Sequence, residues 1–304
     1  MFQEAGSQEQ LTRCAPRFAV TCLEATERTL FIGTVKGLWF LRELDAPATQ
    51  LAGEELVTSV IATGQRVYFS TWMGGGLYAV SQTTLGVERL GYPDTVSYDR
   101  SLIRMHATAL WNNTIAVATD AGLFSYAIGR SRWSEPHSEE SFQFLLATGT
   151  RLWAFCAGEI VGFDRQYRVV ERAAARVAAR PVQEQSRIWW ADTAPTGVRL
   201  WSFTPTSRSP RSIDFRLDET AARRGRIESP TVLARWGAFW YVGTGIPSLD
   251  SPYHPRSGQL LRLNFTRRRA ELVWNGASVS ALAVWRGNLM VGTRDGLYIL
   301  QRMR

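Results

Sequence analysis

One short phrase recurs along this chain of 304 residues. The stretch "TLFIGTVKGLWFL" runs from Thr29 to Leu41, and "NLMVGTRDGLYIL" runs from Asn288 to Leu300. Self-similarity of this kind indicates an architecture built from stacked structural repeats. Related stretches bring the number of copies to seven, which are anchored on the threonine of the GT pair or its equivalent: Thr34, Thr71, Thr119, Cys156, Asp192, Thr244 and Thr293.

Each copy has the pattern of an antiparallel hairpin, with two short β-rich runs joined by a turn of small residues. A further strand precedes each GT strand at a constant offset, and a fourth fits into each gap. Seven units of four short strands predict an all-β fold, a seven-bladed β-propeller. We interpret the constant GT and GL residues as packing residues. The predicted blades of this single domain, residues 1–304, cover residues 17–56, 57–104, 105–140, 141–176, 177–228, 229–278 and 279–301.

The last unit ends near Leu300 and lacks a fourth strand. We expect residues 8–14 at the N-terminus to supply this outer strand. The two ends of the chain would then meet in the last blade and close the ring. Such closure is needed because a blade cannot bury both of its faces alone.

The phrases "FIGTVKGLWFL", "YVGTG" and "MVGTRDGLYIL" resemble the propeller repeats in the sensor regions of two-component regulators. The resemblance covers most of residues 17–301 and implies a β-propeller with a binding role. In that family the propeller is an extracytoplasmic, ligand-sensing module followed by a membrane segment and a signalling domain. The sequence shows neither of these parts, so only the fold and the binding role are carried over.

Composition narrows the class of protein further. No apolar run is long enough to span a membrane, and the first residues lack the apolar stretch of a secretory signal, so we expect a cytoplasmic protein. Cys14, Cys22 and Cys156 have no CxxC spacing, and the three histidines have no ligand spacing. We therefore predict no metal and no cofactor. The formal net charge is +8, and Lys36 is the only lysine.

Alternation of strand direction places the turns after the GT strands and the starts of the innermost strands on one face, the entry face. Long loops and variable side chains on a constant scaffold are typical of a binding site. The alternative is a purely structural role, in which short hydroxyl side chains hydrogen-bond to backbone groups at strand starts. The candidate residues for binding a ligand or partner are Lys36, Trp72, Arg104, His106, Asp120, Gln143, His254 and Arg294.

The opposite face carries arginines in the loops after the GL strands of four successive units. A basic arc of this kind favours an acidic protein surface or, without sequence specificity, a nucleic-acid backbone. The alternative is a charged face that contacts only solvent. The arc comprises Arg130, Arg132, Arg165, Arg168, Arg208, Arg211, Arg267, Arg268 and Arg269.

The sequence contains no nucleophile elbow, no phosphate-binding glycine loop and no paired-carboxylate motif. It therefore favours a non-catalytic interaction or recognition module with a protein partner, as a subunit or scaffold of a larger assembly. The alternative is a small-ligand sensor or an enzyme that uses the channel mouth on the entry face.

Overall fold

The computed structural model describes residues 9–14, 17–53, 55–93, 103–156, 158–205, 209–222, 228–245 and 257–302. These residues form 28 β-strands and one short helix, α1 (Glu219–Ala222). Helix α1 is far too short to cross a membrane, and no other helix occurs in the described ranges. The fold is therefore all-β, as the alternating pattern predicts.

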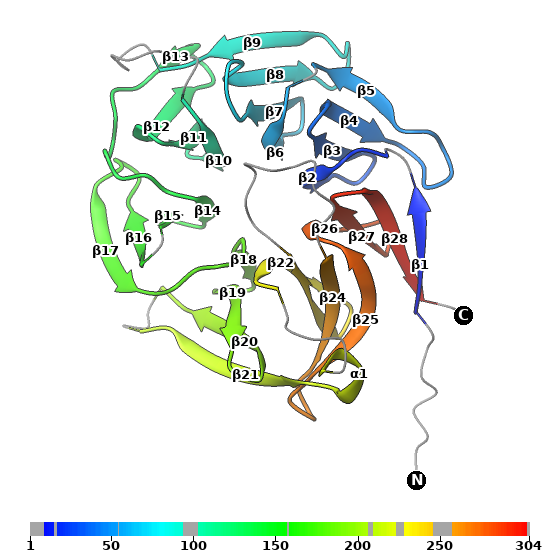
Figure 1. The fold of residues 1–304 in the computed structure, drawn as a ribbon. Coiled ribbons are helices and arrows are strands. Elements are labelled where there is room, and N and C mark those ends of the chain that lie inside the picture. Colours follow the sequence, from blue (N-terminus) through cyan, green and yellow to red (C-terminus); the bar gives the residue numbers. More distant parts are fainter. Residues whose placement is uncertain are drawn as a thin grey trace.

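The described strands fall into seven antiparallel four-stranded units, the blades, which stand around a common axis (Figure 1). The innermost strands of blades 1 to 7 are β2 (Val20–Ala25), β6 (Val57–Ala62), β10 (Met105–Trp111), β14 (Phe144–Thr148), β18 (Val182–Glu184), β22 (Pro230–Trp236) and β26 (Val279–Trp285). The second strands, which carry the GT pairs or their equivalents, are β3 (Leu30–Thr34), β7 (Arg66–Thr71), β11 (Thr114–Thr119), β15 (Arg151–Phe155), β19 (Arg187–Ala194), β23 (Phe239–Thr244) and β27 (Asn288–Thr293).

The third strands, which carry the GL pairs or their equivalents, are β4 (Gly37–Leu41), β8 (Leu77–Ser81), β12 (Gly122–Ala127), β16 (Glu159–Phe163), β20 (Gly197–Phe203), β24 (Ser257–Asn264) and β28 (Gly296–Arg302). The outer strands are β5 (Thr49–Ala52), β9 (Val87–Gly91), β13 (Arg132–Trp133), β17 (Val169–Ala174), β21 (Arg211–Leu217), β25 (Arg269–Ala277) and β1 (Glu9–Cys14). A short parallel pairing between β21 and β25 joins blades 5 and 6 at their outer edges. The molecule is a β-propeller.

The hydrophobic core lies mainly between neighbouring blades rather than inside them. Cys22 and Phe31 of blade 1 pack with Val57 and Phe69 of blade 2, and a similar cluster joins blades 7 and 1. Trp236 of blade 6 also donates from Nε1 to the carbonyl oxygen of Gly287 in blade 7, at 2.8 Å. Each blade thus buries its faces only against its neighbours, which makes the closed ring the stable unit.

The GT and GL residues build one tight turn per blade. In blade 1, Thr34 Oγ1 donates to the carbonyl oxygen of Gly37 at 2.8 Å and accepts the Lys36 N–H at 3.0 Å. Gly37 has a φ of 95°, and a Cβ there would lie 2.1 Å from the carbonyl oxygen of Gly53. Only glycine fits this approach of the outer strand. Cys156 makes the same turn in blade 4 with a thiol, which donates to Glu159 O at 3.5 Å.

The N-terminal strand closes the ring as predicted. Strand β1 pairs antiparallel with β28 from Glu9 opposite Arg302 to Cys14 opposite Leu297. Arg13 donates to the carbonyl oxygen of Asp295, and its guanidinium carbon lies 5.9 Å from the Tyr298 ring centroid. The last blade is therefore completed by the opposite end of the chain.

A repeated backbone hydrogen bond fixes which segments share a face. In five blades, the residue after the GT threonine donates its backbone N–H to a carbonyl oxygen. The acceptor is the residue that directly precedes the innermost strand of the same blade. These bonds are Val35 to Ala19, Trp72 to Leu56, Asp120 to Arg104, Gly245 to Ser229 and Arg294 to Ser278. The GT turns and the starts of the innermost strands therefore lie together on the entry face, as the strand order predicts.

Closure by β1 yields a testable prediction about stability. Leu11 of β1 packs into the cluster between blades 6 and 7, whereas Thr12 beside it is exposed. Leu11→Ala is expected to lower the free energy of unfolding by about 2 kcal/mol, because truncating a packed leucine loses apolar contact. Thr12→Ala is the matched control and is expected to have a much smaller effect. Urea denaturation of the two variants measures the difference, and equal stabilities would contradict a packed closing strand.

Candidate functional site

Four of the predicted entry-face residues form one cluster at the junction of blades 2 and 3. His106 Nε2 lies 2.5 Å from Asp120 Oδ1, and Arg104 Nε lies 3.9 Å from Asp120 Oδ2. The Arg104 guanidinium carbon is 5.1 Å from the Trp72 ring centroid, and the rings of Trp72 and His106 meet edge to face at 5.5 Å. We call Trp72, Arg104, His106 and Asp120 the rim cluster.

Local backbone structure explains why the rim cluster forms. Trp72 begins a glycine-rich turn that Arg89 holds by donating to the carbonyl oxygens of Gly74 and Gly75, both at 2.9 Å. His106 occupies a β-bulge, where the register of β10 and β11 shifts between Met105 and Ala107. A bulge turns a side chain away from the regular alternation. His106 is thereby directed toward Asp120 in the adjacent turn.

The equivalent bulge positions in other blades show what is particular about His106. Thr21, Thr231 and Ser280 each donate a hydroxyl hydrogen bond of 2.5 Å to the first innermost-strand carbonyl of the next blade. Thr58 instead bonds Ser70 within its own blade. These contacts therefore support the alternative interpretation, in which the hydroxyl groups satisfy backbone groups at the strand starts. His106 contacts a carboxylate and an aromatic ring instead.

The other predicted entry-face residues that the structure describes belong to other blades. Lys36, Gln143 and Arg294 belong to blades 1, 4 and 7, whereas the cluster belongs to blades 2 and 3. Gln143 is exposed and uses its backbone N–H to pair with Phe155 O at 2.8 Å. His254 lies outside the described residues.

The rim cluster presents an aromatic surface beside groups of both charges. The side-chain exposure is 43% for Arg104, 40% for Asp120 and 18% for His106. A partly desolvated aromatic, arginine and carboxylate set of this kind is typical of sites that dominate protein–protein binding. Among the described residues, no three His, Cys, Asp or Glu side chains come together in a geometry that holds a metal ion.

The basic arc can be followed for eight of its nine arginines, because Arg208 lies outside the described residues. All eight side chains are exposed. Arg168 pairs with Asp164 at 3.0 Å, and within the described part of the chain the other seven have no ion pair. Exposed arginines without an ion-pair partner create a positive electrostatic potential at the surface. A single exposed ion pair with a binding partner would contribute only about 0.2–1 kcal/mol.

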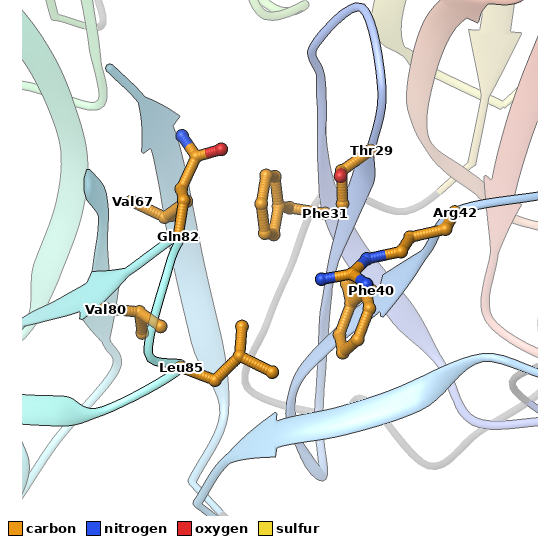
Figure 2. Close-up of a pocket in the computed structure, with 8 residues that line it drawn as sticks. All are labelled: Thr29, Phe31, Phe40, Arg42, Val67, Val80, Gln82 and Leu85. Carbon is orange, nitrogen blue, oxygen red and sulfur yellow. The ribbon is translucent and has the colours of Figure 1, made fainter. Parts of the chain in front are cut away.

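A crevice between blades 1 and 2 is too small to bind a ligand. Figure 2 shows Phe31 and Phe40 facing Val67, Val80 and Leu85 across it. Its volume is about 20 Å³, which is room for little more than one water molecule. Phe31, Phe40, Val67 and Val80 of its lining belong to the core between blades 1 and 2, and the exposed Leu85 completes the apolar part. Thr29, Arg42 and Gln82 are the polar residues of the lining. We interpret it as a packing gap.

A partly buried histidine joins blades 3 and 4. His137 stacks on Tyr167 with ring centroids 3.8 Å apart, and its Nε2 lies 2.9 Å from Ser125 Oγ and 3.2 Å from Ser134 Oγ. The Tyr167 hydroxyl is 2.8 Å from Thr114 Oγ1 of blade 3. Burial lowers the pKa of His137 and raises the pKa of Tyr167. The pair therefore favours a neutral histidine.

Two charged residues on innermost strands or their starts were missed by the sequence analysis. Glu24 of β2 is partly buried, with Oε1 accepting the Ala62 N–H of blade 2 at 3.3 Å. Arg180 lies just before β18 and is also partly buried. Alignment of the repeats carries a signal for both. The positions equivalent to Glu24 are all apolar: Ile61, Ala109, Leu146, Val182, Ala234 and Ala283. The positions equivalent to Arg180 are all uncharged: Cys22, Ser59, Ala107, Phe144, Val232 and Ala281.

No protein-family model matches the chain, and no curated protein matches its sequence. Solved structures do match its fold. Streptogramin B lyase superposes with a TM-score of 0.70 at 12% identity, over 98% of this chain and 99% of that one. The WD40 domain of Neurospora crassa Pan2 gives 0.66 at 12% identity, over 98% and 97%.

A third match is the extracellular domain of a putative one-component system from B. thetaiotaomicron, with a TM-score of 0.67 at 12% identity. It covers 96% of this chain but only 39% of that protein chain. At such identities the likeness extends to the fold. The neighbours include an enzyme, a domain of a sensor-type system and a WD40 domain, so they leave several functions open.

Titration of His137 yields a prediction about pH and stability. Because its pKa is lowered in the folded protein, its contribution to stability is present above about pH 6.5, the unfolded value, and is lost as the pH falls through the folded pKa. His137→Phe keeps an aromatic ring against Tyr167 but cannot titrate. We expect wild type to lose more stability than this variant between about pH 7 and pH 5. Denaturant titrations at several pH values test this, and parallel pH profiles would contradict it.

Proposed function

We propose that this chain is a non-catalytic β-propeller recognition module, a cytoplasmic subunit or scaffold that binds a protein partner through its entry face. The rim cluster is the observation that carries the proposal. Trp72, Arg104, His106 and Asp120 come from two blades yet contact one another at partly exposed positions. Residue types of this kind dominate the binding energy of many protein interfaces.

The scaffold beneath the cluster supports this role. Trp72 is held by a turn that Arg89 braces, and Asp120 is held by its backbone bond to Arg104. Side chains fixed before binding lose less conformational entropy when a partner arrives. The WD40 domain among the structural neighbours is consistent with a protein-interaction role, since it shares the fold.

The second candidate function is a small-ligand sensor or an enzyme that uses the channel mouth. The contact of 2.5 Å between His106 Nε2 and Asp120 Oδ1 favours it, because a carboxylate beside an imidazole fixes its orientation and supports proton transfer. The GT and GL repeats resemble those of ligand-sensing propellers, and the neighbours include a lyase and a sensor-type extracellular domain. Capture of a stable protein partner from the native host favours the first candidate.

The rim cluster yields a prediction about binding. With the partner captured by the tagged chain from its native host, Trp72→Ala and His106→Ala are each expected to weaken binding at least tenfold, as central interface residues do. The melting temperature is expected to stay nearly unchanged, because both side chains are partly exposed. Leu110→Ala is the control, since Leu110 is 40% exposed at the other end of the strand that carries His106.

Affinity and melting temperature together decide the outcome. A fall in melting temperature without loss of affinity per folded molecule would make Trp72 and His106 structural residues. A loss of affinity in Leu110→Ala equal to that in the two cluster variants would place the interface elsewhere.

The basic arc yields a separate prediction about salt. If the arc meets an acidic protein surface or a nucleic-acid backbone, affinity should fall steeply as salt rises, because the field is screened over roughly 8 Å at physiological ionic strength. Replacing Arg267, Arg268 and Arg269 together by glutamine is expected to reduce both the affinity at low salt and its salt dependence. Arg28→Gln, at an exposed position outside the arc, is the control. Titrations of the captured partner and of generic nucleic acid measure this, and unchanged affinity for both would leave the arc a solvent-contacting face.

A further inference from the structure

Two outer strands bring four arginines together at the edge of the ring between blades 5 and 6 (Figure 1). The parallel pairing of β21 with β25 places Arg216 directly opposite Arg269. The Arg216 N–H donates to the carbonyl oxygen of Arg268 at 3.0 Å, and Arg267 precedes Arg268 in the same turn. All four side chains are exposed. We call Arg216, Arg267, Arg268 and Arg269 the arginine seam.

The core fixes the direction in which the two opposed arginines point. Phe215 and Leu217, on either side of Arg216, pack into the cluster between blades 5 and 6. Ala270, beside Arg269, packs into the same cluster. Side chains alternate between the two faces of a strand, so Arg216 and Arg269 are both turned away from the core. Their strands run about 4.8 Å apart, which is the usual spacing of neighbouring strands.

Three carboxylates on or beside the same strands are already engaged. Asp214 accepts two hydrogen bonds from Arg199, at 2.6 and 3.0 Å, and Glu271 pairs with Arg262 at 2.8 Å. Asp218 accepts one backbone N–H from α1 at 2.7 Å and one from β25 at 3.4 Å. Within the described ranges, none of the four seam arginines has an ion pair. Their positive charge is therefore uncompensated.

The opposed pair Arg216 and Arg269 favours a bound anion. Like charges directly opposite each other on neighbouring strands are destabilising. A phosphate group between the two guanidiniums removes this repulsion, because each guanidinium offers paired N–H donors that match phosphate oxygens. Four arginines on two adjoining segments match a ligand that carries several phosphates in a row.

An exposed aromatic ring lies in the same turn. Phe265 begins the turn that contains Arg267 and Arg268, and 40% of its surface is exposed. Its ring meets the buried ring of Phe215 edge to face, with centroids 5.0 Å apart. The core thus anchors the Phe265 ring while leaving it accessible from solvent.

We propose that the arginine seam and Phe265 bind single-stranded nucleic acid. The phosphates contact the arginines, and an unpaired base stacks on Phe265, which is the combination that single-strand binding without sequence preference uses. A duplex keeps its bases stacked inside, and an acidic protein surface lacks the regular alternation of charge and ring that a single strand has. The proposal gives part of the basic arc a defined partner and does not depend on the rim cluster.

Fluorescence anisotropy of a labelled single-stranded oligonucleotide of mixed sequence, titrated with the full chain alone, tests this. The double variant Arg216→Gln with Arg269→Gln is expected to lose at least about tenfold in affinity at low salt. Its slope of log affinity against log salt should become shallower by about 1.4, since each phosphate contact of a single strand contributes about 0.7. The charge-matched control, Arg28→Gln with Arg286→Gln in exposed turns of blades 1 and 7, should bind within about twofold of wild type.

The aromatic part of the site has its own variants. Phe265→Ala is expected to weaken binding at least about fivefold without changing the salt slope, because stacking involves no charge. Phe265→Tyr keeps a ring and is expected to bind like wild type. Melting curves of all variants allow affinity to be compared per folded molecule.

Losses of affinity in the double variant and in Phe265→Ala, with both controls intact, support the site. Several results would overturn it: no binding by wild type at low salt, equal affinity of the double variant and its charge-matched control, or unchanged affinity in Phe265→Ala. Binding of a DNA duplex or of poly-glutamate as tightly as the single strand would also overturn it, in favour of a duplex or an acidic protein. The assay needs no protein partner, so its failure leaves the proposed role of the rim cluster unaffected.

Discussion

Two backbone segments approach each other closely where the third strands of blades 1 and 3 begin. A Cβ on the glycine of the GL pair would overlap a backbone carbonyl oxygen, that of Gly53 at 2.1 Å for Gly37 in blade 1 and that of Ser138 at 2.0 Å for Gly122 in blade 3. The preceding threonine closes the turn by bonding the glycine carbonyl. This turn joins the second and third strands, whose apolar residues pack against the neighbouring blades. The packing of the blades into a ring depends on this pairing of second and third strands.

Much of this architecture could be predicted because the constraint is local and repeated. A glycine that no other residue can replace appears in the sequence as the same letter at the same place in copy after copy. The N-terminal strand was predictable for a related reason, since the last repeat lacks an outer strand and β1 pairs with β28. The link between β21 and β25 was not predictable, because a parallel pairing of a few residues leaves no pattern in either strand.

The candidate site was predicted only in part. Variable residues on a constant turn pointed to Trp72, Arg104, His106 and Asp120, which come together. The same reasoning named Lys36 and Arg294, which lie on other blades, because strand order alone fixes a face but not which neighbours meet. Glu24 and Arg180 were missed because they lie one to three positions beyond the strand-start position that His106 and Gln143 occupy in their own repeats. A charged residue at an otherwise uncharged repeat position is the signal that finds them.

The central claim is that the rim cluster, set on a rigid closed ring, is the surface that recognises a partner. Hydrogen–deuterium exchange of the chain, alone and in the assembly isolated from its native host, tests this most directly. The account predicts that slowed exchange on assembly is concentrated in the turn after Thr71, the start of β10 and the turn after Thr119. Protection confined to the opposite face, in the loops around Arg165 and Arg267, or no protection at either face, would contradict it.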